Sequence, residues 1–282
     1  MSSGRVSGHF LDGQKGRLFL LVRRPQRVIG CVLVVPPFAE EMNKCRRMVT
    51  EVALQLSAMG YIVLVPDLYG TGDSGGEFVD GRWCCWQDDL ARVCTWSSEQ
   101  ASPVTAVLAI RLGGALAVSA AAAGQLPAVL KTVFWQPVFD GSRYLDQFLR
   151  LRTAAALMTD GRGENVAKLR SRLAGGEVLE VGGYEISGAL VADLDTLANA
   201  EPLTETLGSF HWMEVTRSRD SPIPARSLQR IERWRSAGRS VTVSTFVGEP
   251  FWASTEIVRI PDLIQATVDS FTQASSPSVG AA

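Results

Sequence analysis

A sharp turn from an apolar strand into an alanine-rich helix is the place where this chain could present a reactive side chain. The strand is expected over Pro103–Ile110 and the helix over Leu112–Ala123, with Gly113 and Gly114 at the turn. Such a turn holds one side chain above the strand end, at a helix N-terminus, where serine can act as a nucleophile. Here that side chain is Arg111, whose guanidinium stays protonated in proteins and cannot attack a carbonyl. Residue type therefore excludes nucleophilic chemistry at this turn.

The acid and base that would serve such a turn are incomplete. After the strand expected over Phe210–Val215, Asp220 lies where a triad acid often follows, although a turn-capping aspartate fits equally well. The base would be a histidine after the last expected strand, but that loop carries Glu249. The sequence has two histidines, His9 and His211, and neither follows the last strand. The general base of a serine triad is therefore missing as well.

Two uses of the Arg111 charge are consistent with the sequence. Arg111 and Glu249 could form an ion pair across the site, because an unpaired buried charge is strongly destabilising. Alternatively, a guanidinium at a helix N-terminus could bind a carboxylate or phosphate group. The sequence leaves both uses open, and in both of them the Arg111 side chain binds an anionic group.

The loop after the strand expected over Gly30–Pro36 carries Phe38, Glu40 and Glu41. In folds with a nucleophile at a strand-to-helix turn, the corresponding loop donates one backbone N–H to an oxyanion. The two glutamates, with Lys44 nearby, fit the rim of a pocket. They also fit solvated acids in the first turn of a helix, where negative charge is favourable.

A glycine-rich loop follows the strand expected over Tyr61–Pro66. It lacks the lysine and the glycine spacing of nucleotide-binding loops, so we expect no nucleotide there. Ser74 in this loop is a candidate for a displaced nucleophile. A serine hydroxyl needs an adjacent base to become reactive, and the sequence shows none for Ser74.

Strand-like and helix-like segments alternate along the chain, which predicts a mostly parallel central sheet with helices on both faces. The alternation weakens over 140–205, where helical pieces surround a strand-like stretch, Glu177–Tyr184, and we interpret 140–205 as an inserted cap. The core then comprises 1–139 and 206–274, and 275–282 are expected to be disordered. Core helices are expected over Asn43–Met59, Arg82–Ser97, Leu112–Ala123, Ala225–Ala237 and Ile260–Phe271.

Composition argues against several classes of function. The formal net charge over 282 residues is -1, so the chain shows no basic excess for nucleic acid. The five cysteines include no CxxC pair, and we expect buried reduced thiols, no metal and no cofactor. The N-terminus lacks the apolar segment of a signal peptide, and Arg111 interrupts the longest apolar stretch, Val104–Ala123. We therefore expect a cytoplasmic protein without a membrane span.

Several segments together resemble a known group of proteins. They cover most of the chain, and their combination is far more specific than any single segment. The chain resembles the exosortase A system-associated hydrolase 2 group, within the α/β-hydrolase superfamily. The segments that carry the resemblance are Pro36–Lys44 with Arg46–Met48, Pro66–Gly70 with Gly72–Ser74, Arg111–Gly113, Trp135–Pro137, Gln147–Arg152, Gly183–Glu185 and Phe251–Trp252.

This resemblance implies an α/β-hydrolase fold and a bacterial accessory protein encoded with exopolysaccharide biosynthesis and PEP-CTERM protein sorting. It also implies that arginine at the sharp strand-to-helix turn, which is called the nucleophile elbow in this superfamily, is a pattern of the group. This favours a pseudo-hydrolase that binds a ligand or partner. The alternative is an ester or acyl hydrolase, or an acyltransferase, with an unconventional nucleophile acting on a polysaccharide or lipid intermediate. The expected partners are exopolysaccharide or exosortase system proteins.

The resemblance further implies a site for an anionic or saccharide-linked small molecule, lined by aromatic residues that include Trp135, Phe251 and Trp252. A cap–core interface held by ion pairs and aromatic contacts explains the same residues, and we favour that interpretation. Arg152 belongs to the same segment of the cap. The predicted ligand-site residues are Phe38, Glu40, Arg111, Leu112, Gln147, Arg150, Tyr184, Glu185 and Trp252.

Overall fold

A computed structural model describes residues 4–100, 102–159, 164–197 and 205–272. The tail predicted to be disordered, 275–282, lies outside the described residues. Among the described residues, no helix has the length and apolar character needed to cross a membrane.

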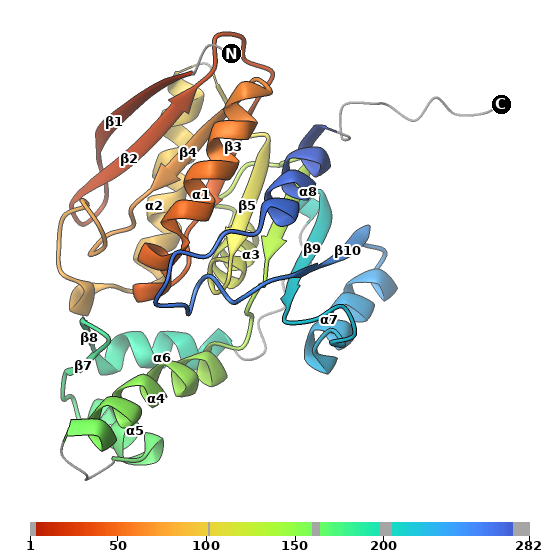
Figure 1. The fold of residues 1–282 in the computed structure, drawn as a ribbon. Helices are drawn as coiled ribbons and strands as arrows, with labels where there is room; N and C mark the ends of the chain where they lie inside the picture. Colours follow the sequence, from red (N-terminus) through yellow and green to blue (C-terminus); the bar gives the residue numbers. More distant parts are fainter. Residues whose placement is uncertain (1–3, 101, 160–163, 198–204, 273–282) are drawn as a thin grey trace.

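An eight-stranded sheet with the order β1-β2-β4-β3-β5-β6-β9-β10 forms the centre of the molecule (Figure 1). β1 pairs with β2 and β2 with β4 in antiparallel fashion, and the other neighbours are parallel. This arrangement confirms the predicted mostly parallel sheet. The strands are β1 (Arg5–Asp12), β2 (Arg17–Arg24), β3 (Gly30–Val35), β4 (Tyr61–Pro66), β5 (Ala106–Ile110), β6 (Lys131–Trp135), β9 (Ser209–Thr216) and β10 (Val241–Val247).

Helices cover both faces of the sheet, so its central strands are apolar without alternation. β5 is buried along its whole length. Side chains of α1 (Glu40–Ala58) and α8 (Pro261–Thr272) pack into one apolar cluster with one face of the sheet. Side chains of α2 (Trp83–Glu99), α3 (Gly113–Ala122) and α7 (Ala225–Ser236) pack into a second cluster on the other face. Figure 1 shows α1 and α8 in front of the sheet and α3 behind it.

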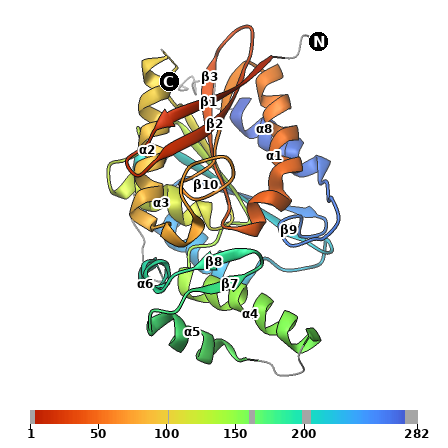
Figure 2. The same ribbon diagram turned by 90° about the vertical axis from the view of Figure 1, so that its left-hand side faces the viewer.

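Five elements between β6 and β9 lie together at one end of the molecule, and we call them the cap (Figures 1 and 2). The strand-like stretch predicted in this region is a hairpin, because Gly182 and Gly183, both with positive φ, form its two-residue turn. Helix α6 was not expected from the sequence. The elements are α4 (Gly141–Thr159), α5 (Val166–Ala174), β7 (Leu179–Val181), β8 (Tyr184–Ile186) and α6 (Gly188–Thr196).

An ion pair and two further hydrogen bonds fasten the cap to the core. Arg82, which precedes α2, donates two hydrogen bonds of 2.7 and 2.8 Å to the carboxylate of Asp193 in α6. The same carboxylate accepts the backbone N–H of Trp83 at 3.0 Å, so a cap residue caps the N-terminus of a core helix. The hydroxyl of Tyr184 accepts a hydrogen bond of 3.0 Å from the amide of Asn43 in α1.

Candidate functional site

The turn between β5 and α3 holds Arg111 in a left-handed conformation, with a φ of 55°. This conformation is uncommon for any residue with a side chain. The Arg111 N–H donates to the carbonyl of Trp135 at 2.9 Å, and its own carbonyl accepts from the N–H groups of Gly114 and Val138, both at 3.0 Å. A Cβ on Gly113 would lie 2.5 Å from the carbonyl oxygen of Pro36, so glycine is required there. The turn therefore has the backbone of a nucleophile elbow with arginine at its apex.

Glu41, in the first turn of α1, binds the Arg111 side chain. Arg111 Nε lies 3.2 and 3.3 Å from the two carboxylate oxygens of Glu41, and its Nη2 lies 3.1 Å from Oε1. The Nη1 group donates to the carbonyl of Gln136 at 3.2 Å. The predicted pair with Glu249 is wrong, because Glu249 is exposed after β10, whereas β3 pairs with β5 and leads the chain to Glu41 beside the elbow.

The ion pair is largely shielded from water. The side chain of Arg111 is 11% exposed and that of Glu41 is 15% exposed. Burial raises the pKa of Glu41, and the neighbouring guanidinium of Arg111 and the phenol of Tyr144 oppose that rise. The guanidinium carbon lies 4.7 Å from the ring centre of Trp252 and 6.0 Å from that of Tyr144. Aromatic rings and a carboxylate thus enclose the charge where this turn would otherwise expose a hydroxyl.

Neither histidine can serve as a base at the elbow. His211 Nε2 lies 2.8 Å from the hydroxyl of Ser244, between neighbouring strands β9 and β10. Burial, and then the charge of Lys131, lower the pKa of His211 to about 4, so its ring is neutral at pH 7. His9 Nε2 lies 2.8 Å from the hydroxyl of Ser7 in β1, at the edge of the sheet. The ring of His9 therefore has its partner within β1, and the ring of His211 has its partner on the neighbouring strand β10.

The remaining catalytic candidates have structural positions. The hydroxyl of Ser74 donates to the carbonyl of Asp67 at 2.5 Å and accepts the N–H of Phe19 at 2.8 Å. The bond from Phe19 fastens the glycine-rich loop to β2, and the two bonds leave no base at that hydroxyl among the described residues. Asp220 is exposed in the turn after β9. Neither Ser74 nor Asp220 is among the described hydrogen-bond partners of the Arg111 side chain, which are Glu41 and Gln136.

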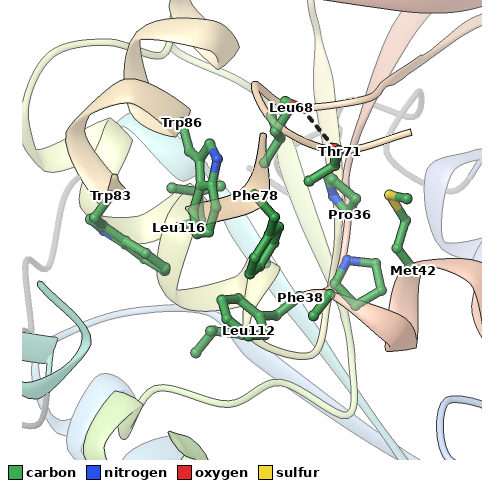
Figure 3. A pocket seen from close by; sticks show the side chains of 13 residues that line it. Pro36, Phe38, Met42, Leu68, Thr71, Phe78, Trp83, Trp86, Leu112 and Leu116 are labelled. Carbon is green, nitrogen blue, oxygen red and sulfur yellow. Dashed lines mark hydrogen bonds between the residues drawn. The ribbon is translucent and has the colours of Figure 1, made fainter. Parts of the chain in front are cut away.

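Phe38 and Leu112 belong to the apolar core. Phe38 is 5% exposed, and its ring makes edge-on contacts with four other aromatic rings. Both residues line an apolar pocket of about 20 Å³ between the elbow and α2 (Figure 3). That volume holds about one water molecule. In this conformation the pocket lined by Phe38 and Leu112 is too small to bind a sugar or an acyl chain.

The aromatic lining predicted for a ligand cleft is only partly present. Trp135 and Phe251 are fully buried and pack edge to face in the core beneath α8, so assigning them to a cleft was wrong. A run of aromatic residues indicates burial, but it does not indicate which surface the rings face. Trp252 is half-buried and lies over the guanidinium of Arg111.

Some of the predicted polar ligand residues bind other side chains or the backbone, and the others are exposed to solvent. Tyr184 lies at the cap–core interface, where its ring also packs on Phe78 at a centroid distance of 4.9 Å. Glu40 forms an ion pair of 3.0 Å with Lys44 within α1. Arg152 binds the carbonyl of Glu180 inside the cap. The exposed residues of this set are Gln147, Arg150 and Glu185.

Two clefts meet at Arg111. The smaller, of about 220 Å³, lies between α1, α4 and the loop after β10, and Glu40, Gln147 and Trp252 line it. The larger, of about 700 Å³, lies between the start of α4 and α7. Glu214 of β9 lines the larger cleft and is 1% exposed. Glu214 was not predicted from the sequence, although a buried glutamate between Met213 and Val215 in a strand is an unusual feature.

No protein-family model and no curated protein matches this chain. Solved structures do match along almost its whole length. Est1E from Butyrivibrio proteoclasticus with bound ferulic acid is 15% identical, with a TM-score of 0.59, and the match covers 94% of this chain and 98% of that chain. A soluble variant of monoglyceride lipase from Saccharomyces cerevisiae is 12% identical, with a TM-score of 0.62, and the match covers 99% and 97%.

Carboxyl esterase 2 from Tuber melanosporum is also similar, with 12% identity, a TM-score of 0.62, and coverage of 98% of this chain and 89% of that chain. The chain has the α/β-hydrolase fold. Within that fold, the turn between β5 and α3 is the nucleophile elbow. The residue at the apex of this turn is Arg111, and Glu249 follows β10, the last of the described strands in the chain. Among the described residues, no cluster of three metal-ligating side chains was found.

Proposed function

We propose that this chain is a pseudo-hydrolase, which retains the α/β-hydrolase fold and has given up serine catalysis. The observation that carries the proposal is the ion pair of Arg111 with Glu41 at the elbow. An arginine cannot form an acyl-enzyme, and the pair occupies the space above the elbow where an ester carbonyl would have to approach. The two histidines are hydrogen-bonded to serines in β1 and β10, so they cannot replace the missing base.

The proposed role is a ligand-binding accessory of exopolysaccharide biosynthesis and PEP-CTERM sorting, acting in the cytoplasm. The resemblance of the sequence to the exosortase A system-associated hydrolase 2 group supports that context. Two clefts that meet at the buried charge of Arg111 support binding, since both are lined by charged side chains. We propose an anionic or saccharide-linked small molecule as the ligand and proteins of the exopolysaccharide or exosortase system as partners.

The alternative is an ester or acyl hydrolase, or an acyltransferase, that uses another nucleophile. Ser74 is the residue that this alternative names, and both hydrogen-bonding directions of its hydroxyl are already used by backbone groups. Activating that hydroxyl would break the hydrogen bond that it donates to the carbonyl of Asp67 within the loop. We therefore favour binding over turnover.

The test is a panel of p-nitrophenyl esters of increasing acyl length, measured with the wild-type chain, Arg111→Ser and Ser74→Ala. The proposal expects rates no higher than the buffer rate for all three proteins, because Arg111→Ser restores a hydroxyl but no histidine. A catalytically competent serine esterase serves as the positive control. Saturable turnover by the wild type that disappears in Ser74→Ala would establish the alternative and end the proposal.

A further inference from the structure

The larger cleft beside Arg111 has a size that the elbow does not explain. Its volume of about 700 Å³ is within the range of 300–1,000 Å³ typical of small-molecule sites. One wall is the loop after β6 and the start of α4, and the other wall is α7. An inorganic anion alone would fill only a small part of this volume, so the cleft suits an extended ligand.

Positive charge predominates on the walls of this cleft. Its lining includes five arginines and two carboxylates, those of Asp140 and Glu214, and one of the arginines, Arg111, is paired with Glu41 of the smaller cleft. Three of the arginines come from α7, at a spacing of four and then three residues, which places them on one face of the helix. The five are Arg111, Arg143, Arg226, Arg230 and Arg233.

Contacts with the opposite wall hold part of the α7 face against the cleft. Arg226 forms an ion pair of 3.0 Å with Asp140. The guanidinium carbon of Arg230 lies 4.7 Å from the ring centre of Phe139. Guanidinium groups fixed in this way are preorganised to bind phosphate through paired hydrogen bonds.

The N-terminus of α7 adds to the positive potential. Its first residues line the cleft, and its N-cap is Pro224, which has no side-chain cap for the N–H groups of the first turn. Helix α7 is 12 residues long, so its dipole contributes a partial positive charge at this end. Anions commonly bind at uncapped helix N-termini of this kind.

Glu214 provides an independent indication of a ligand with hydroxyl groups. One carboxylate oxygen, Oε1, accepts a hydrogen bond of 2.8 Å from the indole N–H of Trp212. The other, Oε2, is buried and has no hydrogen-bond partner among the described residues. Burial raises the pKa of Glu214, and the nearby hydroxyl of Ser227 and the indole of Trp212 oppose that rise. Buried carboxylate oxygens are rarely left without a partner, and a ligand hydroxyl in the cleft would supply one.

We propose that this cleft binds a phosphorylated saccharide, with the phosphate against the arginines and N-terminus of α7 and a sugar hydroxyl donating to Glu214. The proposal rests on the proposed function, since it assigns that function a site and a ligand class. The phosphate accounts for the arginine excess. The sugar accounts for the volume of the cleft and for the buried acceptor at its base.

Isothermal titration calorimetry tests the assignment with glucose 1-phosphate, mannose 1-phosphate and UDP-glucose as probes. Inorganic phosphate and glucose are the matched controls for the two halves of the ligand. At least one phosphorylated sugar is expected to bind with a Kd below about 1 mM, more tightly than inorganic phosphate, while glucose is not expected to bind. Absence of saturable binding by all three probes overturns the assignment. Equal affinity for inorganic phosphate overturns its saccharide part.

Two variants locate the binding within the cleft. Arg230→Gln combined with Arg233→Gln removes two charges from the cleft wall and is expected to weaken binding at least about tenfold. Arg47→Gln makes the same kind of change on the exposed surface of α1 and is expected to leave the affinity unchanged. Binding that survives the double substitution, or that falls equally in the control, overturns the location.

A third variant tests the hydroxyl acceptor. Glu214→Leu is expected to reduce the preference for the phosphorylated sugar over inorganic phosphate, with near-UV circular dichroism confirming the fold. An unchanged preference in a folded variant overturns the role of Glu214. Ester turnover measured on the same preparations keeps the two proposals separate, because an active esterase would refute the pseudo-hydrolase and leave the cleft assignment intact.

Discussion

The ion pair between Arg111 and Glu41 makes a strong prediction about stability. Arg111→Met keeps most of the aliphatic volume of the side chain and removes its charge. Glu41→Gln keeps the shape of the carboxylate and removes its charge. The two single variants and the double variant form a thermodynamic cycle that isolates the interaction.

The expected magnitude follows from the burial of both side chains. Removing one partner of a buried, hydrogen-bonded ion pair costs about 3–5 kcal/mol, because the other charge stays buried without compensation. Because the side chains of Arg111 and Glu41 are only 11% and 15% exposed, we expect each single substitution to cost an amount within this range. The double variant is expected to lose less free energy of unfolding than the two single variants lose together. The difference, which is the coupling energy of the pair, should be about 2 kcal/mol or more.

The cost of Arg111→Met should also depend on pH. Burial already raises the pKa of Glu41, and loss of the guanidinium raises it further. The folded variant therefore keeps a proton on Glu41 at pH values where the unfolded chain has lost it, so its stability falls as pH rises. The destabilisation should be larger at pH 8 than at pH 5.

Urea denaturation followed by tryptophan fluorescence at pH 5 and pH 8 gives the free energies of unfolding for all four proteins. Arg47→Met is the control, since Arg47 forms an exposed ion pair with Glu51 and its loss should cost less than about 1 kcal/mol. Coupling below about 0.5 kcal/mol at both pH values would refute the argument, because the pair would then behave like an ordinary surface salt bridge.

Three further predictions concern the elbow, the cap and a buried carboxylate. Gly113→Ala should unfold or destabilise the chain by about 2 kcal/mol or more in the same urea assay, since the added methyl group would lie 2.5 Å from the carbonyl oxygen of Pro36; a neutral effect would contradict the elbow geometry. Asp193→Ala should raise hydrogen exchange of the cap and of the first turn of α2, because it removes the bonds to Arg82 and to a helix N–H; unchanged exchange would contradict this anchor. Burial raises the pKa of Asp89 to about 7 from 3.8, so the free energy of unfolding should decline between pH 4 and pH 7 in the wild type and less steeply in Asp89→Asn; parallel pH profiles would be the contrary result.

The sequence predicts the sheet and the elbow because both depend on local patterns. The apolar run that forms β5 is followed by two glycines and an alanine-rich helix, and this order alone indicates a tight strand-to-helix turn. The two-residue hairpin turn at Gly182 and Gly183 was missed because a short strand-like stretch does not reveal where it folds back. Helix α6 was missed as well, although Ser187 caps its N-terminus by accepting the N–H of Leu190.

The partners within the site depend on contacts between distant segments, which local patterns cannot supply. Arg111 and Glu41 are 70 residues apart, and they meet because β3 lies beside β5 in the sheet. Glu249 was the more obvious partner from its place in the chain order, yet its loop leaves it exposed. Trp135 has an aromatic side chain suited to a cleft or a core, and only the packing of α8 assigns it to the core.

The central claim is that this chain has no activated serine, at the elbow or elsewhere, and intact-mass spectrometry after exposure to a fluorophosphonate tests it most directly. This reagent forms a stable adduct with activated serines, so the account predicts an unmodified wild-type mass under conditions that label an active serine esterase completely. A stoichiometric adduct on any serine of the native protein, not formed when the protein is denatured before the reagent is added, would contradict the account. It would show that this chain has a catalytic serine.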